Sequence, residues 1–483
     1  MTRALGLRLS ARWQASWLLA VAALGVFFAA DDQTSVVAVL PSMIEGLGLP
    51  QDRFYRAAWI VNGYILGYVV AMPLMGRIAD TYGHARVFAA ALLLFCAGSA
   101  WVALSQGLTM VSVARAFQAV GGGAVVPVAM AMVAANAPPG RRALGFGAMA
   151  AAAEGGGLIG PLWGGGIAEA LGWRGVFWIN LHMCLPLAAA CLWLAREERG
   201  LQRRALDLPG AALAGAGLAL LTVALTDDPI EGRGLALDLA LYAAAATAFA
   251  AFLLRQAKAR EPLLELRLFR LPRLSAAIVT SGLGGGTLIV AMVGVPLFTN
   301  AVLGGSAIEG GLTLMRLSVG LPAGALAGGY AAARFGAGPT AAAGMALAAL
   351  GFAGMAAWSD DPSPAAMTLP LLTAGLGFGL TIAPVNSAAL GQGGEDRRAT
   401  TASLLTIARL IGALVGVALL TTRGLGGFYA EAGLVPLDDP RFEELVRGLE
   451  VDAFQEVFLV TAAVCILAVL PALVMGGRAS RPE

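Results

Sequence analysis

Charged residues are scarce in this chain. They make up 13% of its 483 residues, whereas hydrophobic residues make up 58% and the mean hydropathy is +0.77. Soluble domains carry about a quarter charged residues. The composition therefore excludes a soluble enzyme with an added anchor and indicates an integral membrane protein built from many helices. The net charge of +2 leaves no basic surface for nucleic acid, so we expect no nucleic-acid partner.

Residues that serve metal, disulfide and nucleotide chemistry are also few. Only two histidines occur, His84 and His182, and the four cysteines fall in apolar runs without a CxxC pair. The only lysine, Lys258, follows Gln-Ala, which excludes a phosphate loop of the GxxxxGK type. Neither GxSxG nor HExxH occurs. We therefore expect no catalytic residues, no metal site and no cofactor.

Long apolar runs fill most of the chain. Fourteen of them, at about 20 residues each, are long enough to cross a ~30 Å hydrocarbon core. They are 17–41, 55–75, 87–104, 109–135, 144–171, 176–195, 207–226, 235–255, 274–302, 306–333, 338–358, 366–390, 399–422 and 453–476. An even count places both termini on one side of the membrane. With the termini in the cytoplasm, 22 of the 32 Lys and Arg residues lie inside, 7 outside and 3 within runs, which fits the positive-inside rule.

The fifth run contains the most unusual stretch, AAAAEGGGLIGPLWGGG. It places Glu154 near the middle of the bilayer, where a charge costs several kcal/mol unless it is paired, hydrated or protonated. Gly160, Pro161, Gly164 and Gly165 remove side chains and a backbone donor from one flank, so another helix can approach closely there. An intramembrane acid favours a functional role, whereas plain packing is the leading alternative for the glycines.

Two acids in the first run lie at the depth of a cation in the fourth run. Asp31 and Asp32 lie in the first run, and Arg115 and Gln118 lie in the fourth. Asp32 is about 12 Å below the outer end of its run, and Arg115 is about six residues below the same surface. A nearby cation holds a buried acid ionised. The pair is a candidate proton switch, with a static packing pair as the alternative.

Two further arginines lie near mid-bilayer. Arg316 is about ten residues into the tenth run, and Arg409 is about ten residues into the thirteenth. Opposite charges at the same depth in different helices lower the free energy of burial most by pairing with each other, so we expect one of the two arginines to pair with Glu154. The sequence does not decide which of the two arginines is this partner.

A short turn with the sequence GRIADTYGHAR follows the second run. Gly76 and Gly83 are expected to allow a tight turn between two helices. Arg77, Asp80 and Arg86 can bridge the helix ends, with the acid favouring a helix N-terminus. We expect these five residues to form a gate motif on the cytoplasmic side.

The chain repeats this pattern. Residues 329–336, GYAAARFG, have the same seven-residue glycine step, and residues 375–384 echo residues 115–127 less closely. Internal repeats of this kind are typical of transporters that rock around a midplane site. Ala333 replaces Asp80 in the second copy, so we expect a charge latch in the first half only. The predicted domains are a six-helix bundle at 1–205, an inserted helix pair at 206–262 and a second six-helix bundle at 263–483.

The longest external connection runs from Arg423 to Asp452. Asp439 is predicted as the N-cap of a helix and Pro440 as its first residue. The helical pattern then continues into the last run. We expect a helix extension on the outer side, around residues 424–453, with a disordered loop as the alternative.

These motifs together resemble the major facilitator superfamily, in particular its fourteen-span drug:proton antiporter branch. GRIADTYGHAR resembles the loop motif after the second helix, with Thr81 and His84 where basic residues are more usual. ARAFQAVGGGA resembles the fourth-helix motif, and GLIGPLWGG the antiporter motif of the fifth helix, followed by WRGVFWIN at 173–180. The resemblance covers nearly the whole chain and implies the fold of two six-helix bundles plus two inserted helices.

Within that branch, the chain is most similar to mycobacterial exporters of triacylglycerides, which work with a partner lipoprotein. Asp32, Glu154 and Arg409 lie at matching positions. Gly155–Gly157 and Arg316 depart from the pattern, so the charge network of the relatives does not carry over directly.

The resemblance implies a proton-driven exporter of hydrophobic cargo in the bacterial inner membrane. We expect lipid cargo such as triacylglyceride or glycolipid, with amphipathic drugs as the alternative, and a cavity lined by Met, Leu, Phe and Trp. Protons, membrane lipid and a periplasmic lipoprotein are the expected partners of a monomer. The residues expected to exchange protons are Asp32, Glu154 and Asp31, and their expected charge partners are Arg115, Arg409 and Arg316. A membrane-embedded scaffold or receptor that does not cycle is the hypothesis from another class, and a channel is less favoured.

Overall fold

Long helices dominate the structure. The computed structural model describes residues 11–49, 56–136, 142–195, 207–226, 234–259, 262–390, 398–432, 434–436 and 440–476, and these ranges contain no strand. Each of the fourteen predicted runs coincides with a helix of at least 18 residues in these ranges. Twelve of these helices are long and apolar enough to cross a membrane. The other two, α6 (Arg142–Leu171) and α11 (Ala307–Phe335), are glycine-rich and carry the internal charges Glu154 and Arg316, which lower their hydropathy.

The first six long helices pack on one another and form what we call the first bundle. They are α1 (Ala11–Ala38), α3 (Ala58–Tyr82), α4 (His84–Leu104), α5 (Leu108–Asn136), α6 and α7 (Trp173–Leu194). The main contacts join α1 to α6, α3 and α4 to α5, and α4 to α7. A short helix, α2 (Leu40–Gly46), follows α1.

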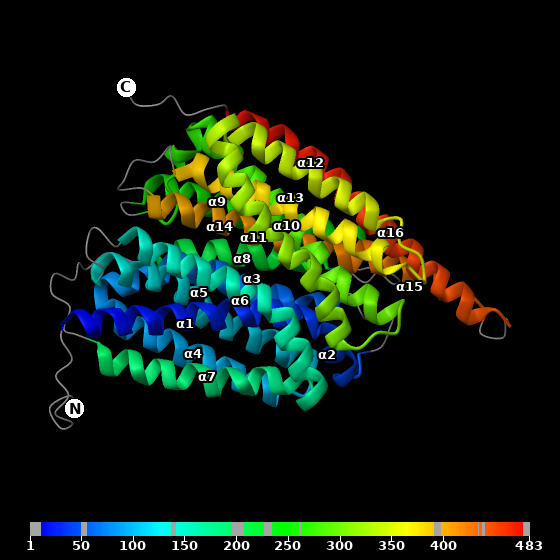
Figure 1. Cartoon of the computed structure of the whole chain (residues 1–483), viewed down its shortest axis with the longest axis horizontal. Helices are drawn as coiled ribbons and strands as arrows, with labels where there is room; N and C mark the ends of the chain where they lie inside the picture. Colours follow the sequence, from blue (N-terminus) through cyan, green and yellow to red (C-terminus); the bar gives the residue numbers. More distant parts are fainter. Residues whose placement is uncertain are drawn as a thin grey trace.

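The last six long helices form the second bundle. They are α10 (Pro272–Ala301), α11, α12 (Ala337–Met355), α13 (Pro364–Leu390), α14 (Arg398–Leu419) and α16 (Phe442–Val474). Here α13 packs between α11 and α12, α10 packs on α14, and α12 packs on α16. Figure 1 shows the two groups one above the other, with their helices running in roughly the same direction.

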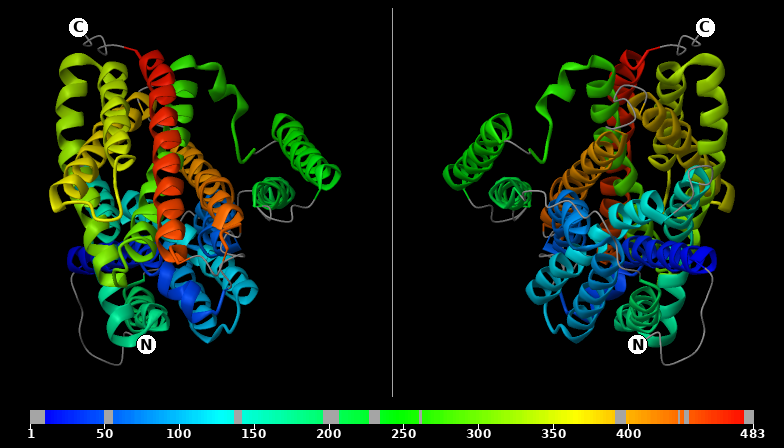
Figure 2. Two further views of the ribbon diagram at one scale, coloured as in Figure 1. Left: turned by 90° about the vertical axis from the view of Figure 1, so that its right-hand side faces the viewer. Right: turned by 90° about the vertical axis from the view of Figure 1, so that its left-hand side faces the viewer.

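A helix pair between the bundles in sequence lies at the side of the molecule. α8 (Leu208–Leu225) packs on α9 (Leu235–Lys258) and also touches α3 and α14 (Figure 2). Asp207 caps α8 by accepting a hydrogen bond from the backbone N–H of Gly210, and it also accepts from Arg255 and Gln256 of α9. Burial raises the pKa of Asp207, but these hydrogen bonds outweigh that effect and lower it.

Equivalent glycine turns occur in the two bundles. Gly83 ends α3 and begins α4 with φ +99°, and Gly336 ends α11 and begins α12 with φ +98°. This backbone conformation is accessible at low cost only to glycine. Gly76 lies inside α3 and does not form the turn, so the expectation that it shares this role with Gly83 was wrong.

One helix extends beyond the others. α16 is continuous for 33 residues, which at about 1.5 Å per residue is near 50 Å, and its first turns project past the other helices (Figure 1). It begins at Phe442 with Arg441 as N-cap, so the prediction that Pro440 is its first residue was wrong. Asp439 lies outside the described residues. The short α15 (Leu425–Ala432) packs against α16.

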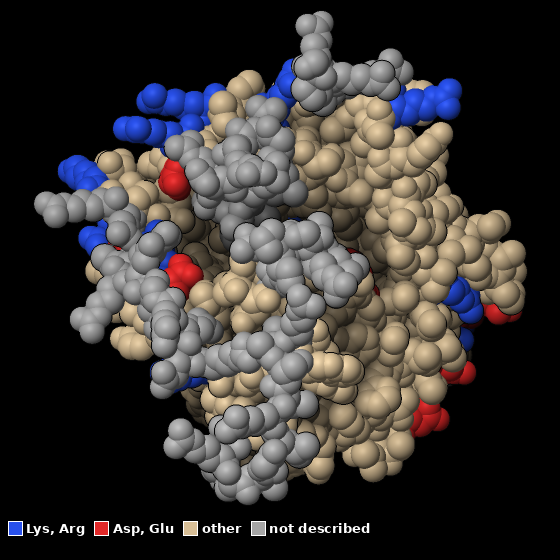
Figure 3. All heavy atoms as spheres, turned by 60° about the vertical axis from the view of Figure 1, so that its left-hand side comes forward, with Lys and Arg blue, Asp and Glu red and all other residues tan. Residues whose placement is uncertain are grey.

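The two ends of the molecule differ in how the bundles meet. We call the end where α1 begins and α16 ends the Ala11 end. At the opposite end, an added Cβ on Gly165 of α6 would lie 2.8 Å from the carbonyl oxygen of Ala307 at the start of α11. The bundles therefore touch closely there. Figure 3 brings the Ala11 end forward and shows a hollow in this face.

Candidate functional site

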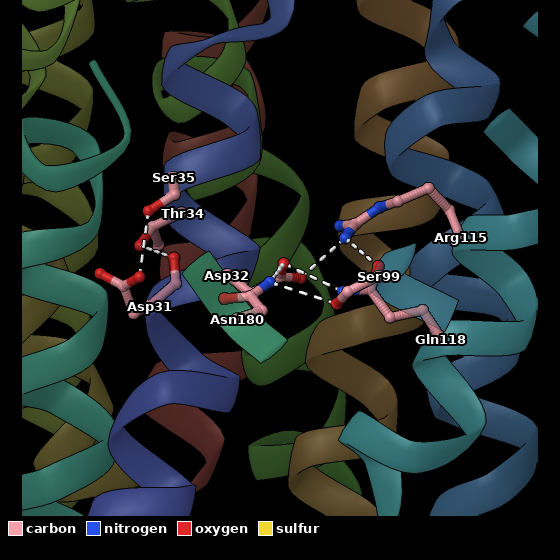
Figure 4. A network of polar contacts seen from close by, with 8 residues as sticks. All are labelled: Asp31, Asp32, Thr34, Ser35, Ser99, Arg115, Gln118 and Asn180. Atoms are coloured by element: carbon pink, nitrogen blue, oxygen red, sulfur yellow. Dashed lines mark hydrogen bonds and ion pairs between the residues drawn. The ribbon is translucent and has the colours of Figure 1, made fainter. Parts of the chain in front are cut away.

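A buried polar network surrounds Asp32. Its Oδ2 accepts a hydrogen bond from Arg115 Nη1 at 2.7 Å, and the same contact is an ion pair between side chains that are 0% and 2% exposed. Its Oδ1 accepts from Asn180 Nδ2 at 2.7 Å and from Gln118 Nε2 at 3.1 Å. Ser99 accepts a further bond from Gln118. The predicted meeting of Asp32 and Arg115 is thus present in the structure (Figure 4).

The guanidinium of Arg115 is held on several sides. It donates to Gln118 Oε1 at 2.7 Å, and its Cζ lies 4.1 Å from the ring centroid of Tyr64 and 5.7 Å from that of Phe177. A cation over an aromatic face gains about 2 kcal/mol when both are desolvated. The charge is therefore stabilised by its ion pair and by aromatic rings, although Arg115 Nε has no hydrogen-bond partner.

Sequence reasoning missed the roles of Asn180 and Ser99. Asn180 on α7 and Ser99 on α4 are buried and complete the hydrogen bonds around Asp32. Both are isolated polar residues within apolar runs. Since buried polar groups need partners, this pattern is a signal that could have identified them.

Asp31 lies on a different side of α1 from Asp32 (Figure 4). It is 3% exposed, and its Oδ2 accepts a hydrogen bond from Ser35 Oγ at 3.3 Å. Its Oδ1 is buried without a hydrogen-bond partner. The two neighbouring acids therefore lie in different environments, one fully paired and the other partly unsatisfied.

Glu154 and Arg409 belong to different bundles and line one cavity. The cavity has a volume of about 110 Å³. Glu154 projects from α6 and is exposed to it, and Arg409 projects from α14 and is half-buried. The remaining lining residues are Thr280, Ser281, Gly284, Gly285, Leu288, Phe378, Thr381, Ile382, Val385, Asn386, Leu405 and Thr406. The structure therefore places Arg409, and not Arg316, in the cavity with Glu154.

The lining of this cavity differs from the expected one. Phe378, Leu288 and Leu405 are apolar, but hydroxyl and amide side chains also line the wall. The expected wall of Met, Leu, Phe and Trp was wrong for this cavity, because short polar residues inside the spans were overlooked in favour of the overall composition. The wall combines apolar surface with hydrogen-bonding groups and one charge of each sign.

Arg316 lies on α11 and points to a separate environment. It is half-buried, and its Nη1 is buried without a hydrogen-bond partner. Arg316 and Asp31 are thus ionisable groups within spans that each have an unsatisfied buried atom. Neither group lines the cavity that Glu154 and Arg409 share.

The predicted glycine seam joins three helices. An added Cβ on Gly164 would lie 2.7 Å from Ser35 Cα on α1, and Ser35 Oγ donates to the carbonyl of Gly160 at 2.8 Å. On the other side, Gly311 of α11 lies against the carbonyl of Pro161. The small residues therefore let α6 contact α1 within its own bundle and α11 of the second bundle.

The gate motif has contacts other than those expected. Asp80 lies in the last turn of α3, not at a helix N-terminus, and its Oδ1 is 3.3 Å from His84 Nε2. Arg77 donates to the carbonyl oxygen of Pro262 at 2.7 Å, which ties α3 to the segment before α10. Arg86 lies in the first turn of α4. The acid is therefore paired across the Gly83 turn by a histidine that replaces the more usual basic residue.

Comparison with known proteins agrees with this architecture. The model of the Major Facilitator Superfamily matches residues 22–417. A triacylglyceride transporter of Mycobacteroides abscessus is 33% identical over 435 residues, which cover 86% of this chain and 84% of that protein. A triacylglyceride transporter of Mycobacterium tuberculosis is 30% identical over 496 residues, which cover 96% of each chain.

Solved transporters share the fold at low sequence identity. A bacterial homolog of the human lysosomal transporter Spinster has a TM-score of 0.68 at 17% identity, with 97% of this chain and 99% of that chain covered. The POT family transporter PepTSo has a TM-score of 0.65 at 18% identity, with 96% of this chain and 97% of that chain covered. Together with the matched family model and the paired helix bundles, these similarities show that this chain is a multi-pass membrane transporter of the Major Facilitator Superfamily.

Proposed function

We propose that this protein is a proton-driven exporter of lipid cargo, such as triacylglyceride or glycolipid, that works by alternating access. The observation that carries the proposal is the cavity shared by Glu154 of the first bundle and Arg409 of the second. Because the two charges lie on different bundles, a change in the protonation of Glu154 alters the attraction between the bundles. That difference biases the equilibrium between two arrangements of the bundles.

Asp32 is the second proposed proton site. In this state Arg115, Gln118 and Asn180 all donate hydrogen bonds to it. For Asp32 to accept a proton, the bond from Arg115 must weaken first. We propose that movement of α5 relative to α1 loosens this ion pair in the other state, so that protonation and bundle movement are linked.

The energy available fits such a cycle. One proton that moves down a membrane potential of ~100 mV releases about 2.3 kcal/mol before any pH gradient is added. Two protons, one at each proposed site, therefore supply about 5 kcal/mol, which is close to the ~5.5 kcal/mol that shifts a two-state equilibrium from 1:99 to 99:1.

The cargo proposal is supported by the relatives and by the cavity wall. Two of the similar proteins are named triacylglyceride transporters. The amide of Asn386 can donate to an ester carbonyl, while Leu288 and Phe378 can contact acyl chains. The hydroxyls of Thr280 and Ser281 already donate to the backbone carbonyls of Ala276 and Leu405. Amphipathic drugs are the competing cargo, and a lipoprotein that receives the lipid is a proposed partner.

The proposed setting is the bacterial inner membrane, with both termini in the cytoplasm. In this orientation the hollow at the Ala11 end opens to the cytoplasm, and the projecting turns of α16 lie on the outer side. We propose domain limits of 1–205 and 263–483 for the two bundles and 206–262 for the inserted pair. A protein labelled at residue 13 and tested for access from either side of sealed vesicles checks the orientation.

The test of coupling uses purified protein in lipid vesicles with a fluorescent triacylglyceride. Glu154→Gln and Asp32→Asn are expected to abolish the acceleration of transport by an imposed pH gradient. Glu169→Gln removes an exposed acid from the same helix as Glu154 and is the matched control, for which the acceleration should persist. A full response to the gradient in both test variants would refute proton coupling, and transport of drugs but not of lipid would refute the cargo.

A further inference from the structure

The unsatisfied atoms of Asp31 and Arg316 lie on two helices that the glycine seam brings together. Asp31 Oδ1 and Arg316 Nη1 are both buried without a hydrogen-bond partner. An ion left unpaired inside a membrane protein costs several kcal/mol. An acid and a base that each have an unsatisfied buried atom, on helices joined by the seam, therefore call for a common explanation.

The seam places the two residues at one depth. α11 runs antiparallel to α6, with Gly165 against Ala307 and Pro161 against Gly311. Continuing this register by five residues, about 7.5 Å along each helix, brings Arg316 level with Gly156. On its other side, Gly156 lies 3.0 Å from the backbone nitrogen of Asp31, measured from an added Cβ. Asp31 and Arg316 thus flank the same glycine of α6.

The missing side chains at this level bring α1 close to α6 and leave room beside one of the three glycines. Gly156 packs against the backbone of α1 at Phe27 and Asp31, whereas Gly157 has only Thr34 within 4 Å of an added Cβ. An arginine side chain is long, so Arg316 is suited to reach across helix positions that lack side chains. This relation accounts for both departures from the family pattern, the three glycines and Arg316.

We infer that Asp31 and Arg316 form a cross-bundle ion pair in the state opposite to the one seen here, and that Asp31 is protonated while the pair is open. In the present state Asp31 Oδ1 holds the proton and Oδ2 accepts from Ser35. When α11 moves along α6, the proton passes from Oδ1 to water, and the carboxylate binds the guanidinium. The inference rests on the proposed proton-driven cycle and adds a proton site to it.

The charged and titratable surroundings of Asp31 permit this assignment. The charged and titratable side chains on the helices that pack on α1 include, within the spans, Arg115 on α5, Glu154 on α6, His182, Cys184 and Cys191 on α7, and Arg316 on α11. The first charged residue of α10 is Arg273 at its start, and α2 carries Glu45. Arg115 is already bound to Asp32, and Arg409 on α14 faces the cavity with Glu154. Of the described cations at this depth, Arg316 is the one with an unsatisfied Nη atom; Arg115 also has an unsatisfied Nε, but its Nη1 is bound to Asp32 and Gln118.

A double-mutant cycle on the rate of transport tests the pair. Asp31→Asn and Arg316→Gln are each expected to slow transport about tenfold, and the double variant should be no slower than either one. This corresponds to a coupling of about 1.4 kcal/mol. Arg334→Gln, which removes a cation from the end of the same helix, is the control, and its effect should multiply with that of Asp31→Asn. If the fold reductions in transport rate caused by Asp31→Asn and Arg316→Gln multiply in the double variant, the inferred ion pair is wrong.

Infrared difference spectroscopy gives a readout that does not depend on transport. The protonated carboxyl stretch that disappears in Asp31→Asn should be present in the resting protein and lost when cargo and alkaline pH drive the other state. Arg316→Gln should keep that band under both conditions. A band that is absent at rest, or that is lost equally in Arg316→Gln, would overturn the inference. A Glu154 band that never changes would instead contradict the proposed function, so the two failures are distinguishable.

Discussion

The ion pair between Asp32 and Arg115 allows an asymmetric prediction for stability. Arg115→Met leaves a buried carboxylate with two neutral donors, Asn180 and Gln118. Removal of one partner of a buried pair costs about 3–5 kcal/mol. Asp32→Asn is expected to cost less, about 1–3 kcal/mol, because Arg115 keeps Gln118 Oε1 at 2.7 Å and the Tyr64 ring at 4.1 Å.

The double variant isolates the pair. If the interaction is direct, Asp32→Asn with Arg115→Met should be less destabilised than the sum of the single variants by about 2 kcal/mol. Thermal unfolding in detergent measures this. With about 2.1 cal/mol/K of unfolding entropy per residue, a chain of this length shifts its Tm by about 1 °C per kcal/mol. Additive shifts, or a larger loss in Asp32→Asn than in Arg115→Met, would refute this account of the network.

Three further predictions concern packing, a turn and acid stability. Gly160→Leu should separate α6 from α1 and destabilise the fold by more than about 3 kcal/mol, because Thr34 already occupies that space. The control Gly448→Ala meets nothing within 4 Å and should leave Tm unchanged or raised. Equal losses of stability in both variants would contradict the seam. Gly336→Ala should lower the free energy of unfolding by about 1–3 kcal/mol because of its φ of +98°, which a melting curve checks. The folded pKa of Asp207 is depressed, so its contribution is present above its unfolded value of 3.8 and is lost as pH falls through the lower folded value. Asp207→Asn should therefore lower Tm at pH 7, and this deficit should shrink as pH falls below 3.8. A deficit that stays the same throughout the acid range would exclude this charge-based role.

The sequence predicted the helices and one ion pair because both follow from position along the chain. The length of each apolar run determines where a span can lie, and depth alone brought Asp32 and Arg115 together. The Gly83 turn was predicted because its conformation is local. These features need no knowledge of how the helices are arranged around one another.

Contacts that depend on rotation about a helix axis were not predictable in this way. Arg316 and Arg409 lie at one depth, and only the packing of α11 on α6 and the position of α14 place Arg409 with Glu154. Asp31 and Asp32 are adjacent in sequence but face different helices. Asn180 was missed because its partner is 148 residues away in the sequence.

The start of α16 shows a further limit of local patterns. Proline commonly occupies the first turn of a helix, but Pro440 lies in a turn before Phe442. The first turns of α16 project beyond the other helices, and the capping pattern alone does not reveal where this extension begins.

Proton flux that depends on cargo tests the central claim most directly. Vesicles that contain the protein and an internal pH indicator are exposed to triacylglyceride without any imposed gradient. The account predicts that cargo moving through the wild-type protein changes the internal pH, and that Glu154→Gln abolishes this change while Glu169→Gln preserves it. Lipid transport by the wild-type protein without any change in pH would contradict it.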